Sequence, residues 1–246
     1  MLRADFHHHL NTDPVDPFVP HSAGQLIDRA VALGLDVLAI TCHESIPYDG
    51  DATRYAAERG LLLIRGMEAT VDGQHALLLN FPEFPAGKCS IEDIAACKTA
   101  DSLVVAPHPF YPGKIASGGI LAAHTEVFDA VEFSGMYTAL TPQFNRRAVA
   151  YARAARLPVL GNTDTHFLWQ LGSTMSLIDA PPDRAAVISA IREGRVHLST
   201  TPLSWVKLVR FIVQSNSASI LGDSLRYMVK VLRRTQRATA RPANSF

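Results

Sequence analysis

The chain has 246 residues, of which 48% are hydrophobic and 19% are charged. A chain of this length and composition buries roughly 70–75% of its surface, so a disordered or collagen-like protein is excluded. Basic and acidic residues number 23 each. They are unevenly spread, because the segment from Leu203 onward has eight basic residues and one aspartate, a net charge of +7, and the remainder has a net charge of −7. The mildly acidic body argues against a domain that coats nucleic acid.

The cysteines and the N-terminus predict a cytoplasmic protein. Cys42, Cys89 and Cys97 form an odd set without C-x-x-C spacing, which excludes a disulfide framework and a cysteine zinc ribbon. The N-terminus lacks the apolar stretch of a signal peptide. The best apolar run, residues 31–40, is interrupted by Asp36 and is far shorter than a membrane span.

Short apolar runs alternate with helical patterns along the chain. The predicted strands, most of them apolar on both faces, are residues 2–7, 36–41, 61–65, 76–81, 103–106, 127–133, 158–160 and 173–178. Helix starts are marked by Ser22, by Ser90 with Asp93 in capping-box spacing, and by Thr141-Pro142. This βαβα order predicts an α/β protein with a mostly parallel sheet, closed into a distorted barrel rather than doubly wound.

Histidines and carboxylates gather where predicted strands end. Because strand side chains alternate, Asp5, His7 and His9 are predicted to share one face, while His8 points to the other. A purification tag is the alternative explanation of residues 7–9, but tags are usually longer and lie outside the folded pattern.

Four further motifs repeat this placement later in the chain. Asp72-Gly73 is a two-residue hairpin signal, and closing that turn places Thr70 opposite His75 and Leu77 opposite Glu68. Glu68 and His75 are therefore predicted to share a face, close enough for one metal ion to bridge them. The other strand-end candidates are His43, His108, Asp164 and His166. Mixed ligation by histidine and carboxylate suits zinc, manganese or iron.

Taken in order, these motifs resemble the polymerase and histidinol phosphatase (PHP) superfamily. The matching segments are DFHHH (residues 5–9), ITCH (40–43), GMEATVDGQH (66–75), APHP (106–109) and GNTDTH (161–166). Each motif is weak alone, and five in the right order make a strong match. The resemblance covers roughly residues 2–200. It implies a TIM-like, distorted (β/α)₇ barrel with two or three divalent metal ions (zinc, manganese or iron) that hydrolyses phosphate esters.

The resemblance also implies a role for each matching residue. The first metal would be held by His7, His9, Glu68 and Asp164. Glu68 would bridge to a second metal held by His75 and His108, and His43 and His166 would hold a third. Asp13 is the predicted further ligand of the third metal, with Asp16 and His21 as alternatives because the loop of residues 11–21 is longer than usual.

Two motifs depart from the family pattern. Cys42 stands where the family has the aspartate of T-D-H, so the change is expected to affect how ligands are oriented rather than how many there are. A buried thiol that takes no part in the site is favoured over a Cys42 metal ligand. Asn162 and Thr163 stand in place of Gly and Ser in G-S-D-x-H, a change expected to be benign.

The predicted reaction is hydrolysis of a small phosphorylated substrate by a water molecule that the metals activate. Glu68, Asp164 and His166 are the predicted catalytic residues, and Lys114 and Glu132 the predicted substrate-binding residues. Lys114 is alternatively a solvated surface charge, and Glu132 a support for a metal ligand or a carboxylate at the edge of the core. The competing function is a PHP-type nuclease or a degenerate metal-binding domain. No stable nucleic-acid partner is expected, because the acidic body has no obvious basic, aromatic-lined groove.

Residues 1–202 are predicted to form the barrel and residues 203–246 a basic amphipathic tail. Leu221, Leu225, Met228 and Leu232 fall on one helical stripe. Packing of this stripe against the barrel is favoured over contact with an anionic membrane surface or a partner protein. Every predicted ligand precedes Thr200, so catalysis is expected not to depend on the tail.

Overall fold

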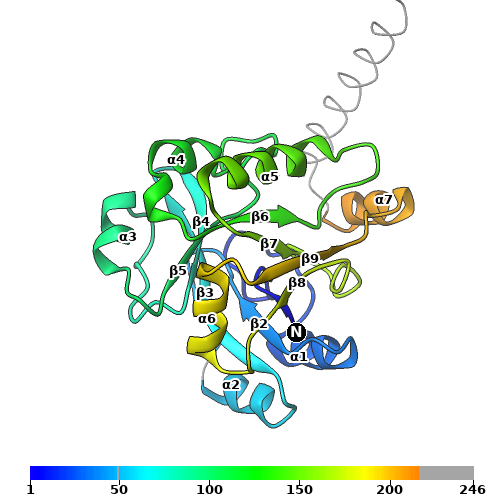
Figure 1. Cartoon of the computed structure of the whole chain (residues 1–246). Helices are drawn as coiled ribbons and strands as arrows, with labels where there is room; N and C mark the ends of the chain where they lie inside the picture. The colour runs from blue at the N-terminus through cyan, green and yellow to red at the C-terminus, as the bar shows by residue number, and fades with distance from the viewer. Residues whose placement is uncertain (49, 216–246) are drawn as a thin grey trace, which may run out of the picture. The chain divides into compact units, whose positions relative to one another are not determined.

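The computed structural model of the chain describes residues 1–48 and 50–215 (Figure 1). The chain divides into two units, Met1–Ser204 and Trp205–Phe246. Within the second unit the structure describes helix α7 (Trp205–Gln214), and the predicted stripe from Leu221 to Leu232 lies outside the described residues. No helix in the described part of the chain is long and apolar enough to cross a membrane.

The first unit is built on one sheet whose strands alternate with helices in chain order. The strands are β1 (Leu2–Asp5), β2 (Val37–Ile40), β3 (Leu62–Val71), β4 (Gln74–Leu79), β5 (Leu103–Ala106), β6 (Ala130–Ser134), β7 (Val159–Asn162), β8 (Thr174–Ile178) and β9 (Val196–Thr200). The helices are α1 (Ala23–Ala32), α2 (Gly50–Ala57), α3 (Ile91–Cys97), α4 (Gly118–Ala123), α5 (Gln143–Ala155) and α6 (Arg184–Arg192), with a 3₁₀ turn at Thr125–Val127. The predicted helix start at Ser22 and the predicted capping box of Ser90 with Asp93 are confirmed, and Ser22 also forms a capping box with Gln25.

The sheet is mixed, which corrects the expectation of mostly parallel pairing. Its order is β7-β6-β5-β4-β3-β2-β1-β8-β9. β1, β2 and β3 are parallel, as are β5, β6 and β7. β4 is antiparallel to both of its neighbours, because a two-residue turn joins it to β3. β8 is likewise antiparallel to β1 and β9.

The sheet closes nearly into a barrel, as predicted. Strands β1 to β7 surround the end of the barrel where the parallel strands have their carboxyl ends. Beyond the end of β1, His8 forms a parallel bridge with Thr165, which follows β7. Thr165 N–H donates to His7 O at 3.0 Å, and His9 N–H donates to Thr165 O at 3.1 Å. At the carboxyl ends, β1 therefore meets β7 directly. At the other end, β8 and β9 occupy the gap between them.

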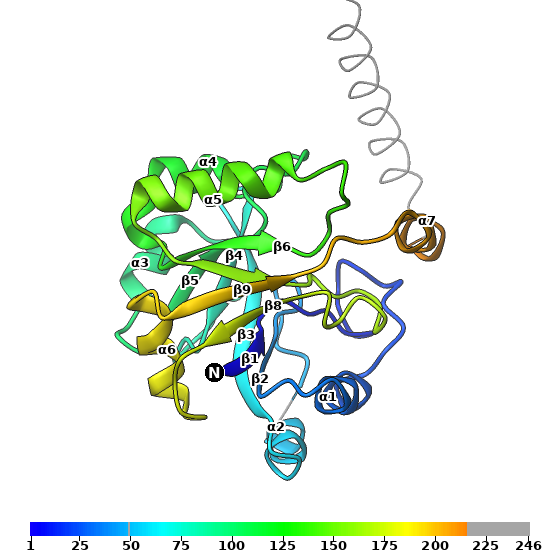
Figure 2. The ribbon, with the colours of Figure 1, turned by 45° about the vertical axis from the view of Figure 1, so that its right-hand side comes forward.

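Three apolar clusters hold this arrangement together. The barrel interior contains Ala4, Ile64, Leu77, Val105 and Leu160, with residues of α6 packed against them. A second cluster lies between β3–β6 and helices α3–α5, and a third between β2–β3 and helices α1–α2. Figures 1 and 2 show α4 and α5 together on one side of the sheet and α1 and α2 on another. The carboxyl ends of the parallel strands are left to polar residues.

Gly161 lies at the closely packed seam between β7 and β8. Its N–H donates to Ser176 Oγ at 3.0 Å, and a Cβ at this position would meet the Leu198 side chain and, at 2.8 Å, the Met175 carbonyl oxygen. We expect Gly161→Ala to lower the free energy of unfolding by about 1–3 kcal/mol, the usual cost of overpacking. Urea denaturation measures this. In the control Gly24→Ala the new Cβ would have Ser22 Oγ, at 4.0 Å, as its nearest contact outside the helix backbone. An equal loss of stability in this control would show that close packing at Gly161 is not the cause.

Candidate metal centre

A polar layer replaces the apolar interior towards the carboxyl ends of the strands. On β6, Ala130 faces the interior core and Glu132 comes next on the same face. On β7, Leu160 is followed in the same way by Asn162. This layer is fully buried, and its polar groups must find partners within the protein.

His7 and His9 enter this layer from the segment after β1. Their ring centroids lie 5.2 Å apart, so the structure brings them together as the alternation predicted. His8 lies elsewhere: its Nδ1 is 2.6 Å from Ala39 O and its Nε2 is 3.3 Å from Asp5 Oδ2. The prediction that Asp5 shares the face of His7 is wrong, because β1 ends at Asp5 and its carboxylate binds Thr163 and faces His8.

The hairpin of β3 and β4 supplies the next two candidates. The predicted register is confirmed, with Thr70 paired to His75 and Glu68 to Leu77. Asp72 and Gly73 have φ of 48° and 77°, the left-handed pair that a type I′ turn needs. The register places His75 Nδ1 2.7 Å from Glu68 Oε1.

Glu68 is the centre of the cluster, and its carboxylate is 1% exposed. Its two oxygens face two different sets of imidazoles. Oε1 lies 2.7 Å from His75 Nδ1 and 3.1 Å from His108 Nε2. Oε2 lies 3.0 Å from His7, 3.2 Å from His43 and 3.4 Å from His9, each measured to Nε2. A carboxylate placed in this way has the geometry of a bridging ligand.

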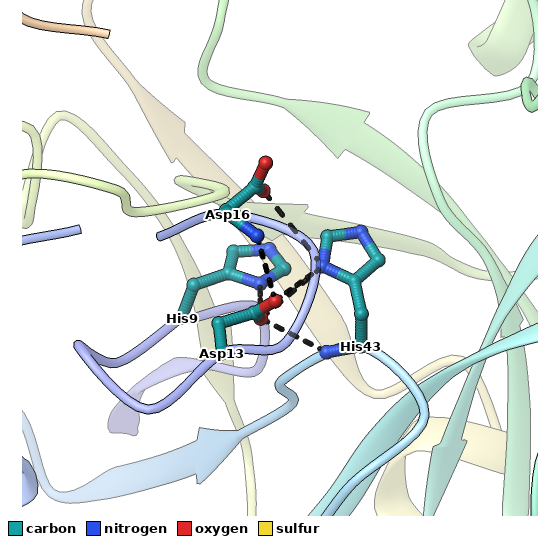
Figure 3. A group of neighbouring side chains, drawn as sticks. All are labelled: His9, Asp13, Asp16 and His43. Atoms are coloured by element: carbon teal, nitrogen blue, oxygen red, sulfur yellow. Dashed lines mark hydrogen bonds and ion pairs between the residues drawn. The ribbon is translucent and has the colours of Figure 1, made fainter. Parts of the chain in front are cut away.

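A second group of ligand atoms forms where the loop after β1 meets the end of β2 (Figure 3). Asp13 Oδ2 lies 2.8 Å from His9 Nδ1 and accepts the His43 N–H at 2.9 Å. Asp13 Oδ1 accepts the N–H groups of Val15 and Asp16 at 2.9 and 3.1 Å. Asp13 therefore holds the loop and orients His9 and His43, and much of its accepting capacity is already used.

Asp16 is the carboxylate that His43 and His166 share. Its Oδ2 lies 2.8 Å from His166 Nε2 and 3.7 Å from His43 Nδ1. The side chain is 19% exposed, so it lies at the solvent side of the cluster. Asp13, the acidic residue nearest to the H-x-H motif, was the first candidate from the sequence and Asp16 an alternative, because the loop of residues 11–21 is longer than in the family pattern.

Asp164 and His166 follow β7 and complete the cluster. Asp164 Oδ1 lies 3.3 Å from His9 Nε2 and 3.5 Å from His7 Nε2. Asp164 and His108 both have left-handed backbones, with φ of 53° and 59°. Such a conformation costs a side-chain-bearing residue about 1–2 kcal/mol and is typical of residues aimed at a functional site.

Glu132 contacts His7, which favours a role in supporting a metal ligand, one of the roles considered for it from the sequence, over contact with substrate. It is 0% exposed. Its Oε2 accepts from His7 Nδ1 at 2.8 Å and from Asn162 Nδ2 at 3.1 Å. It therefore fixes the ring of His7 with Nε2 directed at Glu68, as carboxylates commonly do for ligating histidines.

We expect Glu132→Gln to weaken metal binding about 10–100-fold, the usual cost of losing such an orienting carboxylate. Titration of the apo protein with Zn²⁺ or Mn²⁺ measures this. Because the amide keeps the size of the side chain, circular dichroism should be unchanged. Unaltered affinity would contradict the orienting role.

The charges of the cluster stabilise one another. Burial lowers the pKa of His7, but Asp164, Glu68 and Glu132 outweigh it, and the pKa lies well above its usual value. Burial raises the pKa of Glu68, but His7, His75 and His43 lower it well below its usual value. The pKa of Asp164 is also lowered, because His7, His166 and His9 outweigh the burial that raises it. The carboxylates are therefore ionised and need positive partners.

Comparisons with known proteins agree with this fold. A family model described as PHP-associated matches residues 142–196. A crystal structure of a two-domain protein from Bacteroides vulgatus, described as containing a predicted PHP-like metal-dependent phosphoesterase, superposes with a TM-score of 0.60 at 18% identity, covering 85% of this chain and 68% of that one. The family-model match and the shared fold agree with the resemblance of the sequence motifs to the PHP superfamily.

Two other relatives extend the likeness. PsfC from Pseudomonas syringae has the same fold, with a TM-score of 0.60 at 21% identity over 92% of this chain and all of its own. An uncharacterized protein of Methanocaldococcus jannaschii is 28% identical over 119 residues, which are 45% of this chain and 70% of that protein. These comparisons show a shared fold.

The donor set of this chain fits divalent metal ions. Ligand atoms lie within 4.8 Å of one another in five overlapping groups: His9, Asp13, Asp16 and His43; His7, His108 and Asp164; His7, His9 and Glu68; His9, Asp164 and His166; and His43, Glu68 and His75. His9 Nε2 is buried and has no hydrogen-bond partner. A divalent cation would satisfy this atom and replace the protons that otherwise balance the carboxylates.

Three residues singled out from the sequence lie outside these groups. His21 is buried, with both ring nitrogens unpartnered, and burial together with His8 lowers its pKa to about 4. Cys42 is buried, and burial and Asp13 raise the pKa of its thiol, so the thiol stays protonated. Lys114 is exposed on the loop that passes His75, where Ile115 O accepts the His75 N–H at 2.8 Å. A substrate-binding role for Lys114 stays a prediction.

Proposed function

We propose that the chain is a metal-dependent hydrolase of phosphate esters. The observation that carries this proposal is the bridging geometry of Glu68, whose two oxygens face separate sets of histidines. Two cations close together, when bound, lower the pKa of a water molecule and neutralise phosphoryl charge. A histidine and carboxylate donor set suits zinc, manganese or iron, and two or three ions are proposed.

The ligand groups assign residues to each proposed ion. Glu68 joins His7, His9 and Asp164 on one side, and His75 and His108 on the other. A third ion would be held by His43 and His166 with Asp16, the carboxylate that contacts both rings. Asp13 would orient the rings of His9 and His43 through its contacts with the Nδ1 atom of each.

Exposure determines which of these residues a substrate can reach. The side chains of Glu68 and His7 are at most 1% exposed, whereas those of His108, His166, Asp164 and Asp16 are 11–19% exposed. A phosphate ester therefore approaches over this open edge. His108 and His166 are the imidazoles placed to donate a proton to a leaving alkoxide, while the buried residues hold and orient the ligands.

The proposal is tested by comparing the rate at which the protein hydrolyses an aryl phosphate with the rate at which it cleaves a short oligonucleotide. With Mn²⁺ or Zn²⁺ present we expect phosphate release from the aryl ester, loss of that activity after dialysis against a chelator, and recovery when the metal is returned. Cleavage of the oligonucleotide alone would favour the nuclease alternative. Tag-free protein that contains no metal and retains none after soaking would contradict the hydrolase proposal.

A further inference from the structure

Helix α7 presents a continuous apolar face to solvent. Trp205, Val206, Val209 and Val213 are 46%, 78%, 56% and 70% exposed. At 100° per residue these four positions fall within about one third of the helix circumference. Large apolar side chains exposed side by side in this way mark a contact surface rather than ordinary protein surface.

The exposed apolar residues of the first unit have a different distribution. Met1, Val15, Ile115, Leu140, Val149 and Leu198 are each at least 36% exposed, but they are spread over separate loops, strands and helices. Scattered residues of this kind are normal on a folded protein. Among the described residues, the two valines with the largest exposed fractions, Val206 and Val213, therefore both lie on α7, on one face of the helix.

The charged residues of this part of the chain are almost all basic. Lys207 and Arg210 lie beside the valine face without interrupting it, and α7 contains no acidic residue. From Leu203 to the end, the sequence contains eight lysines and arginines and one acidic residue, Asp223. Such a segment is attracted to a dense array of negative charge.

We propose that α7 binds an anionic lipid surface. An amphipathic helix buries its apolar face at the boundary between headgroups and acyl chains, and its basic side chains contact the headgroups. Trp205, at the start of the helix, suits this boundary, where tryptophan is enriched. For a helix of this kind the buried apolar area and the attraction to anionic lipids both add to the strength of binding. This proposal does not depend on the proposed hydrolase activity.

Sedimentation of the full chain with lipid vesicles tests the inference. We expect binding to phosphatidylcholine vesicles that contain phosphatidylglycerol, and little binding to phosphatidylcholine alone. Val209→Asp should weaken binding about tenfold or more, because it places a charge in the apolar face. Lys207→Glu together with Arg210→Glu should do the same, since each basic residue near an anionic surface contributes about fivefold.

Val149→Asp is the matched control, an exposed valine on α5 of the first unit. It should bind vesicles as the unaltered chain does. Trp169→Phe leaves Trp205 as the remaining tryptophan, and its fluorescence should shift to the blue when anionic vesicles are added. Metal content and circular dichroism verify that each variant is folded.

Three results would overturn the proposal. The first is that the unaltered chain does not bind anionic vesicles, and the second is that Val209→Asp binds as well as Val149→Asp. The third is a vesicle-independent response, in which the α7 variants alter oligomeric state or hydrolysis of a soluble ester while vesicle binding is unchanged. That result would assign the valine face to a second copy or to the chain itself.

Discussion

Glu68→Ala is expected to abolish metal loading and to lower hydrolysis by at least about 100-fold, the upper end of the cost of losing a mere orienting group. The carboxylate faces five imidazoles through two oxygens. Its removal therefore takes one ligand from each of two proposed ions. It also leaves five histidines without their shared counter-charge. Elemental analysis of the purified variant and its rate on an aryl phosphate measure the two effects.

Glu68→Gln separates the charge of Glu68 from its shape. The amide fills the same volume, and its nitrogen is a poor metal ligand, so loading should fall in this variant as well while the fold is kept. Circular dichroism and denaturation report on the fold. Full loading and activity in either variant would show that the bridge is wrongly assigned.

His7→Ala and His8→Ala are expected to have opposite effects. His7 Nε2 lies 3.0 Å from Glu68, and its Nδ1 is held by Glu132. The His7 variant should therefore lose metal and about 100-fold or more in activity. His8 binds Ala39 O and faces Asp5, outside the ligand groups, so its variant should keep its metals and most of its activity.

The structure adds a cost that the alternation of side chains does not show. His8 is 0% exposed, so His8→Ala leaves a cavity and removes a buried hydrogen bond, and we expect a loss of about 2–4 kcal/mol in the free energy of unfolding. Denaturation and metal analysis of both variants separate the effects. Equal metal loss in the two would contradict the placement of His8 outside the site.

Local patterns in the sequence determined much of the site. The Asp72-Gly73 turn set the β3–β4 register and so the pairing of Glu68 with His75, because turn type and side-chain alternation are local properties. The helix start at Ser22 and the capping box of Ser90 with Asp93 followed from local residue types and spacing in the same way. The order of the five motifs resembles the PHP superfamily, and the barrel that this resemblance implies agrees with the nearly closed sheet of the structure.

Only the tertiary structure decided how distant segments meet. The bridge between His8 and Thr165 closes the rim, and β8 and β9 fill the gap below it. Glu132 lies under His7 because β6 and the end of β1 come together in that closure. Asp16 rather than Asp13 links His43 to His166 because an irregular loop places it there. These positions depend on packing between segments far apart in the sequence, and such packing leaves no periodic signal in the residues themselves.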